Sequence, residues 1–308
     1  MRIRYAATAV AAIAALGTLG ATASAMASSS PPAPASVRAN AFHAARTESA
    51  AFQQYYAYAT AADRSGHPEL AGAWQTVGTV EYYDHWMGDT ALAGKYQSTN
   101  NATNLKVAIS QARQTATADL AFAAKAPKGS PAAGVLRTLA ARETADARLL
   151  QQALNGSVPP APAVTTVSIR VSARPHFSGS FYNDLTGGAN SALSDAALNW
   201  GEYQFFARNA VNSGQPKLAQ LLSGLEAQEM NQNWPAISNV AGYVNGNAAN
   251  LRTSIASEQG AIQMYTKFAA EATKAGDPSA ARMFTGVRSD EMGHHQTFTT
   301  ELQQLTGK

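Results

Sequence analysis

The sequence predicts an all-α protein with four helices, a Pro-rich linker and four further helices. Three observations support this prediction. Apolar residues recur at three- and four-residue steps along most of the chain, Gly and Pro mark the ends of these segments, and the segment order before the linker repeats after it. The chain has 308 residues, 45% of them hydrophobic and 14% charged, which is enough for two domains with a core each.

The first 27 residues have the features of a secretory signal peptide. Arg2 and Arg4 precede an apolar, Ala-rich run, and the segment from Ala23 to Ala27 contains two overlapping A-x-A cleavage signals. A transmembrane anchor is the alternative, but the apolar run is short and small residues follow it. We therefore expect a secreted or extracytoplasmic protein, with no stable membrane span after signal cleavage.

The remaining chain divides by composition and periodicity. We expect a disordered, Ser/Pro/Ala-rich lead-in at 28–39, a first helical domain at 40–154, a partly extended Pro-rich linker at 155–188, and a second helical domain at 189–308. Within the first domain, Gly66 ends one helix and Pro68 opens the next. Gly214 and Pro216 have the same roles in the second domain.

The two domains match each other residue by residue, which indicates an internal repeat. Gly, Pro, Trp and acidic positions recur at the same spacings in both. The matched pairs are Glu48 and Ala196, Gly66 and Gly214, Pro68 and Pro216, Glu81 and Glu229, Trp86 and Trp234, Glu143 and Glu291, and Asp146 and His294.

Glu291 and His294 form a Glu-x-x-His unit, and this spacing places a carboxylate and an imidazole on one face of a helix. Four-helix bundles with carboxylate-bridged metal pairs use such units together with single Glu residues from other helices. The candidate metal ligands are Glu229, Glu258, Glu291 and His294 in the second domain, and Glu48, Glu81, Asp84, Glu143 and Asp146 in the first. His85 follows Glu81 by four residues and could replace Asp84 only after a small rotation of the helix.

Four stretches of the sequence resemble the ferritin-like superfamily, and rubrerythrin-type bundles in particular. They are the run from Glu48 to Tyr56, Gly66-x-Pro-Glu-Leu-Ala, Glu81-x-x-Asp84, and the segment from Phe284 to His294. The resemblance implies two tandem up-down four-helix bundles joined by the linker, each with a carboxylate-bridged pair of iron or manganese ions. Such centres activate dioxygen or peroxide, or oxidise ferrous iron. The all-oxygen ligand set of the first domain favours manganese, calcium or magnesium.

Composition excludes several other classes of function. The chain has no Cys, which excludes disulfides, thiolate metal sites, iron–sulfur clusters and thiol catalysis. The formal net charge of +3 falls to +1 once Arg2 and Arg4 are removed, so nucleic acid is not an expected partner.

Two hypotheses remain for the function. The first is an exported ferritin-like protein that binds metal ions and acts as an oxidase or ferroxidase. The second is a non-enzymatic binding or structural module in which hydrogen bonds, rather than metal ions, hold the buried carboxylates of degenerate sites.

Overall fold

The computed structural model describes residues 33–96, 98–172 and 188–307. These stretches contain helices and no strand, which confirms the all-α prediction. The signal peptide predicted for residues 1–27 lies outside the described residues, as does the first part of the predicted lead-in. None of the described helices combines the length and the apolar character that crossing a bilayer requires.

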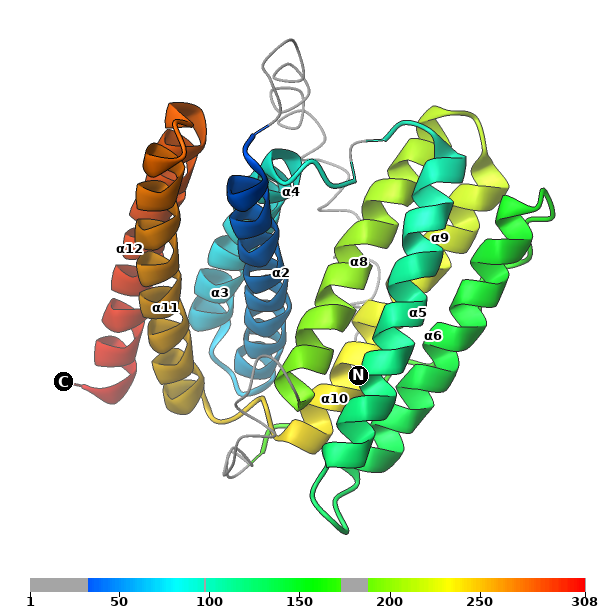
Figure 1. Cartoon of the computed structure of the whole chain (residues 1–308). Helices are drawn as coiled ribbons and strands as arrows, with labels where there is room; N and C mark the ends of the chain where they lie inside the picture. Colours follow the sequence, from blue (N-terminus) through cyan, green and yellow to red (C-terminus); the bar gives the residue numbers. More distant parts are fainter. Residues whose placement is uncertain (1–32, 97, 173–187, 308) are drawn as a thin grey trace.

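The helices follow the predicted order (Figure 1). Two short π-helical segments are inserted among them. The elements are α2 (Ala35–Arg64), α3 (Pro68–Val80), the π-helical η3 (Glu81–Trp86), α4 (Met87–Leu92), α5 (Asn101–Lys125), α6 (Ala132–Leu154), α8 (Ala189–Asn212), α9 (Pro216–Gln228), the π-helical η4 (Glu229–Asn233), α10 (Trp234–Ala241), α11 (Asn247–Lys274) and α12 (Pro278–Thr306).

The predicted helix ends are confirmed at the turns between paired helices. Gly66 and Gly214 adopt φ values of +81° and +71°, a left-handed conformation that Gly enters without steric cost. Pro68 and Pro216 then open α3 and α9. Asp277 caps α12, because its side chain accepts a hydrogen bond from the backbone N–H of Ala280.

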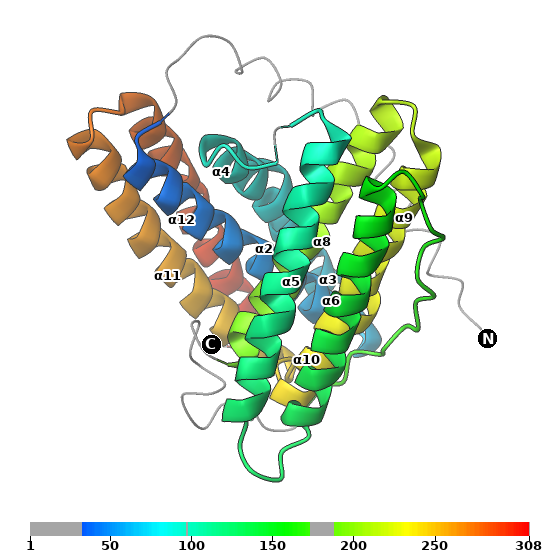
Figure 2. The same ribbon diagram turned by 45° about the vertical axis from the view of Figure 1, so that its right-hand side comes forward.

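The helices pair as four hairpins, and the hairpins assemble out of chain order. The first hairpin (α2 with α3, η3 and α4) packs on the last one (α11 and α12), through contacts of α2 with α11 and of α3 with α12. We call this group the terminal bundle. The two middle hairpins (α5 and α6; α8 with α9, η4 and α10) pack together as the central bundle, as Figures 1 and 2 show from two directions.

The expected bundles of residues 40–154 and 189–308 are therefore wrong, because each bundle takes one hairpin from each of the expected domains. The physical reason is that an amphipathic hairpin has one apolar face, and its sequence pattern specifies that face without specifying which hairpin covers it.

Two predicted boundary segments also differ from expectation. Residues 35–39 of the predicted disordered lead-in are helical, and Val37 is fully buried among α11 and α12 side chains that include Phe268 and Phe284. The linker joins two helices of one bundle, α6 and α8, instead of two domains. Its described part is extended and lies against η4 and α10, where Val167 N donates to Asn231 O at 2.8 Å and Arg170 N donates to Asn239 Oδ1 at 2.8 Å.

The two bundles share a packed aromatic interface between α2 and α8. The rings of Phe52 and Trp200 are stacked with centroids 4.7 Å apart, and the ring of Tyr82 lies 4.7 Å from that of Trp200. Trp86 lies directly over Gly201 of α8, where a Cβ atom would be only 2.7 Å from the indole ring. This interface places η3, which carries Trp86, firmly between the two bundles.

Candidate metal centre

Six buried side chains with metal-ligating atoms meet in the core of the terminal bundle, and every one of its four long helical segments contributes. They are Glu48 of α2, Glu81 and His85 of η3, Glu258 of α11, and Glu291 and His294 of α12. All six are at most 9% exposed. They form two overlapping groups in which the ligand atoms lie within 4.8 Å of one another. One group contains Glu48 and His85, the other contains Glu258 and His294, and both contain Glu81 and Glu291.

The π-helical turn explains how η3 provides two of these side chains. In an α-helix, the residues three and four positions on both share a face with the first, whereas a π-turn holds about one more residue, which turns the third position away and keeps the fourth on the same face. Here Glu81 and His85 both point into the core, and His85 Nδ1 lies 2.8 Å from Glu81 Oε2. Asp84, the predicted ligand at this turn, is exposed, so that prediction is wrong.

Glu81 and Glu291 each offer one oxygen atom to each histidine. His85 Nδ1 lies 2.8 Å from Glu81 Oε2 and 3.2 Å from Glu291 Oε1. His294 Nδ1 lies 3.0 Å from Glu81 Oε1 and 3.5 Å from Glu291 Oε2. Two carboxylates with their oxygens divided between two imidazoles in this way have the arrangement of bridging ligands between two neighbouring cations.

The outer nitrogen of His85 faces a further carboxylate. His85 Nε2 lies 3.5 Å from Asp290 Oδ2, and the Asp290 side chain is 57% exposed. A carboxylate in this place favours a proton on Nε2, which leaves Nδ1 free to act as a ligand. Burial alone would lower the pKa of His85, but the adjacent carboxylates of Glu291 and Glu81 outweigh it and raise the pKa to about 11. The same two partners raise the pKa of His294 to about 9 against the effect of burial.

Tyrosine hydroxyls hold the two outer carboxylates. Tyr265 donates to Glu48 Oε1 and also lies 2.6 Å from Asp89 Oδ2, while Tyr55 donates to Glu258 Oε1. Burial and the charges of neighbouring carboxylates raise the pKa of Glu48 well above its ordinary value. Burial and the adjacent Glu291 carboxylate do the same for Glu258. Without a cation, therefore, protons hold these carboxyl groups in the core.

Several inward-facing atoms in the cluster lie 3.0–3.5 Å from a neighbouring polar atom without the geometry of a hydrogen bond. They are Glu81 Oε1, both carboxylate oxygens of Glu291, and His294 Nδ1. Buried polar atoms without hydrogen-bond partners cost free energy, and a bound metal ion would contact these atoms and offset that cost. Four carboxylates and two neutral imidazoles carry a charge that two divalent cations would balance, so the residues present fit such a pair.

A second, smaller cluster lies in the core of the central bundle. Glu143 and Asp146 of α6 meet Glu229 of η4, with ligand atoms within 4.8 Å of one another and no more than 2% exposure. Glu229 was predicted to join Glu258, Glu291 and His294, and the structure instead separates it from them. Glu143 and Asp146 were likewise grouped with first-domain residues that lie in the other bundle.

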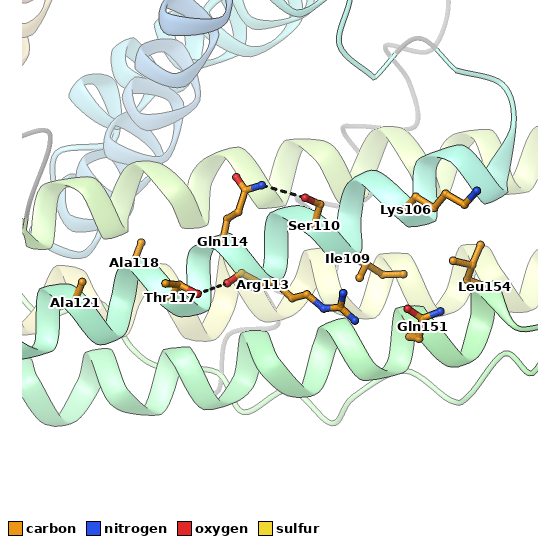
Figure 3. A pocket seen from close by; sticks show the side chains of 10 residues that line it. All are labelled: Lys106, Ile109, Ser110, Arg113, Gln114, Thr117, Ala118, Ala121, Gln151 and Leu154. Atoms are coloured by element: carbon orange, nitrogen blue, oxygen red, sulfur yellow. Dashed lines mark hydrogen bonds between the residues drawn. The ribbon is translucent and has the colours of Figure 1, made fainter.

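A surface pocket lies apart from both clusters. It is a groove of about 680 Å³ on the outer side of α5 and the end of α6, seen in Figure 3. Its lining contains basic and small polar side chains, and no carboxylate or imidazole: Lys106, Ile109, Ser110, Arg113, Gln114, Thr117, Ala118, Ala121, Gln151 and Leu154. The chemistry-bearing residues are thus enclosed in the bundle cores.

Comparisons with protein-family models, with curated proteins and with solved structures give no significant match for this chain. The interpretation of the two clusters therefore depends on their geometry.

Proposed function

We propose that the terminal bundle is a ferritin-like, rubrerythrin-type bundle that holds a pair of iron or manganese ions. The observation that carries this proposal is the division of the Glu81 and Glu291 oxygens between His85 and His294. A carboxylate can accept several hydrogen bonds, but each Nδ1 can donate only one N–H and faces two carboxylate oxygens. Two carboxylates that each lie close to both histidines are better explained by two cations, which share the two carboxylates.

The groups of neighbouring ligand atoms assign the other side chains. One ion would be held by Glu48 and His85 and the other by Glu258 and His294, with Glu81 and Glu291 shared. Mixed carboxylate and imidazole ligands suit iron and manganese, and carboxylates alone would favour calcium or magnesium. The protein residues around the ligands orient them: Asp290 faces His85, Tyr265 holds Glu48, and Tyr55 holds Glu258.

The reaction that we propose is oxidation, as an oxidase or as a ferroxidase that acts on ferrous iron. A pair of reduced ions at this position would supply electrons to dioxygen or peroxide. The surrounding protein keeps the reaction away from bulk water, because the six ligands are buried under helices on all sides. With no Cys in the chain, electrons would not come from a thiolate-bound iron centre of this chain. The signal-like N-terminus supports a site of action outside the cytoplasm.

Metal content and ferrous-iron oxidation test this proposal. Protein prepared with ferrous iron or manganese should carry about two ions in the terminal bundle, by elemental analysis, and should oxidise ferrous iron in the presence of dioxygen. Glu291→Gln should lose both ions and the activity, because this residue is shared. Asp84→Asn is the matched control, since this exposed carboxylate lies on the same π-helical segment.

Two results would contradict the proposal. Wild-type protein that takes up no metal ion under these conditions would contradict the metal centre itself. Protein that binds two ions but reacts with neither dioxygen nor peroxide would contradict the oxidase, and would leave a metal-binding module.

A further inference from the structure

The central bundle repeats the architecture of the terminal bundle with a different set of side chains. By the internal repeat, Glu229 and Glu143 of the central bundle stand where the shared carboxylates Glu81 and Glu291 stand in the terminal one. Asp146 takes the place of His294. The positions of Glu48 and Glu258 are occupied by Ala196 and Ala112, and the position of His85 by Asn233.

At the His85 position, Asn233 replaces the imidazole ligand, and its amide group is oriented to donate a hydrogen bond to the cluster. Arg142 Nη1 donates to Asn233 Oδ1 at 3.1 Å, and Asn233 Nδ2 donates to Glu229 Oε2 at 3.1 Å. Arg142 stands in the repeat where Asp290 stands, so the carboxylate and imidazole pair has been exchanged for a guanidinium and an amide. With its oxygen bound to Arg142, Asn233 presents only N–H groups to the cluster, and this end cannot hold a cation.

At the opposite end of the cluster, buried carboxylate oxygens face one another without a donor between them. Glu143 Oε2 and Glu229 Oε1 have no hydrogen-bond partner, and Asp146 Oδ2 is held by a 2.6 Å hydrogen bond from Gln228 Nε2. Neighbouring amides thus orient the outer oxygens and leave the inner ones free. The small side chain of Ala112, where the repeat has Glu258, leaves no protein carboxylate opposite them.

Two further buried side chains beside these three also have acceptor atoms without a donor. Asn199, which is fully buried beside Glu143 and donates to Thr115 Oγ1 at 3.4 Å, has a free Oδ1 atom. Asp119 is 1% exposed, and neither of its carboxylate oxygens has a hydrogen-bond partner. The charge of Asp119 acts on Glu229, and that of Glu143 on Asp119. One shared proton could pair a single set of two oxygens, and it would leave these other acceptors unsatisfied.

We propose that Glu143, Asp146 and Glu229 form a second metal site, which binds a single hard divalent cation such as Mn²⁺, Mg²⁺ or Ca²⁺. The three ligands are all carboxylates, as such cations prefer, and the missing positions would be filled by water. Bound water molecules would also supply the donors that Asn199 and Asp119 lack. The chain would then contain one dinuclear centre with histidines and one mononuclear centre with oxygen ligands only.

Mn²⁺ binding to the full chain tests this second site independently of the terminal centre. In the double variant Glu81→Gln, Glu291→Gln, both shared carboxylates of the terminal bundle are lost, and about one equivalent of Mn²⁺ should still bind. Adding Glu143→Gln should abolish it. If the double variant, folded by circular dichroism, binds no Mn²⁺, then protons hold the central carboxyl groups and the proposal is wrong.

A second measurement uses the chain with its terminal centre intact. Glu143→Gln alone should lower total Mn²⁺ binding by about one equivalent and leave ferrous-iron oxidation unchanged. Spin-echo spectroscopy of Mn²⁺ in the double variant should show no coupling to imidazole nitrogen, since this cluster has no histidine. Unchanged Mn²⁺ binding in Glu143→Gln would overturn the second site without affecting the proposed function, which instead depends on Glu291.

Discussion

His85 Nδ1 lies 2.8 Å from Glu81 Oε2, and both side chains are 1% exposed or less. Residues four apart share a face in an ordinary α-helix too, so the effect of the π-helical segment Glu81–Trp86 is to turn Asp84, three positions after Glu81, out to solvent. At the repeat-related position, Asn233 Nδ2 lies 3.1 Å from Glu229 Oε2 inside the second π-helical segment. Both bundles therefore have a widened turn at which residues four apart face one core, and π-helical turns often occur at functional sites.

This register gives a direct prediction. The double variant Asp84→His, His85→Ala creates a Glu-x-x-His unit at residues 81–84, but it should bind no more metal than His85→Ala alone. Position 84 is exposed, so an imidazole there points to solvent. Elemental analysis of the two variants checks this prediction. Restored binding in the double variant would show that the segment adopts an ordinary α-helical turn when metal is present.

Helices and turns were predictable from local signals, since Gly66, Pro68 and Asp277 act within a few residues of their own position. The position of Glu291 and His294 on one helix face was also predictable, because their spacing of three residues is a local signal. The register of η3 is not predictable, because a π-turn leaves no distinct pattern in a single sequence, and the sequence therefore favours Asp84 over His85 at this turn.

The partnership of the hairpins was also missed, but the sequence contains a signal for it. Glu48 has no counterpart in the second domain, where Ala196 stands, and Glu258 has none in the first, where Ala112 stands. Treated as separate bundles, both domains have an incomplete set of ligands. Exchanging hairpins places Glu48 with Glu258 and both alanines together, which gives one complete set and one reduced set.

Metal binding in the terminal bundle should release protons. Burial and neighbouring carboxylates raise the pKa values of Glu48 and Glu258, and pKa values of about 11 and about 9 keep His85 and His294 charged at neutral pH. Ligands bind metal in their deprotonated form, so the cations should displace protons from these groups, and both histidines should each release one. Affinity should consequently rise with pH. Calorimetry in buffers with different ionisation enthalpies measures the number of protons, and a heat independent of buffer would contradict this account.

Glu202 offers a test of pH-dependent stability outside both clusters. Burial raises its pKa to about 8, only partly offset by a hydrogen bond with Tyr96 and the charge of Lys95. Between the ordinary pKa near 4.5 and about 8, the folded protein holds a proton that the unfolded chain has lost. The associated stability is fully present below pH of about 4.5 and is lost as the pH rises through about 8, by up to about 1.4 kcal/mol per pH unit.

Glu202→Gln should therefore stabilise the metal-free protein relative to wild type at pH of about 8 and have little effect at pH of about 5. Urea unfolding at both pH values measures the difference. Glu69→Gln is the control, because Glu69 is exposed at the start of α3 and should give no pH-dependent difference. An equal effect of Glu202→Gln at both pH values would show that the shape of this side chain, and not its protonation, determines its contribution to stability.

Gly201 is the residue on which the contact between the two bundles most directly depends. A Cβ atom at this position would lie 2.7 Å from Trp86 Cζ2 and 3.1 Å from Cε2, and both atoms belong to a rigid ring that is 1% exposed. Gly201→Ala should therefore destabilise the protein by about 1–3 kcal/mol. Gly260→Ala in α11 is the matched control, because nothing lies within 4 Å of its Cβ position. That change should be neutral or stabilise the helix by up to about 1 kcal/mol.

The same substitution should weaken metal binding, although Gly201 lies in the central bundle and the metal centre in the terminal one. Trp86 follows His85 directly in η3, so a displaced indole ring moves the backbone that positions this histidine. Urea unfolding and Mn²⁺ titration of Gly201→Ala, compared with Gly260→Ala, measure both effects. Lower stability with unchanged metal affinity would show that η3 holds His85 in place without the support of α8.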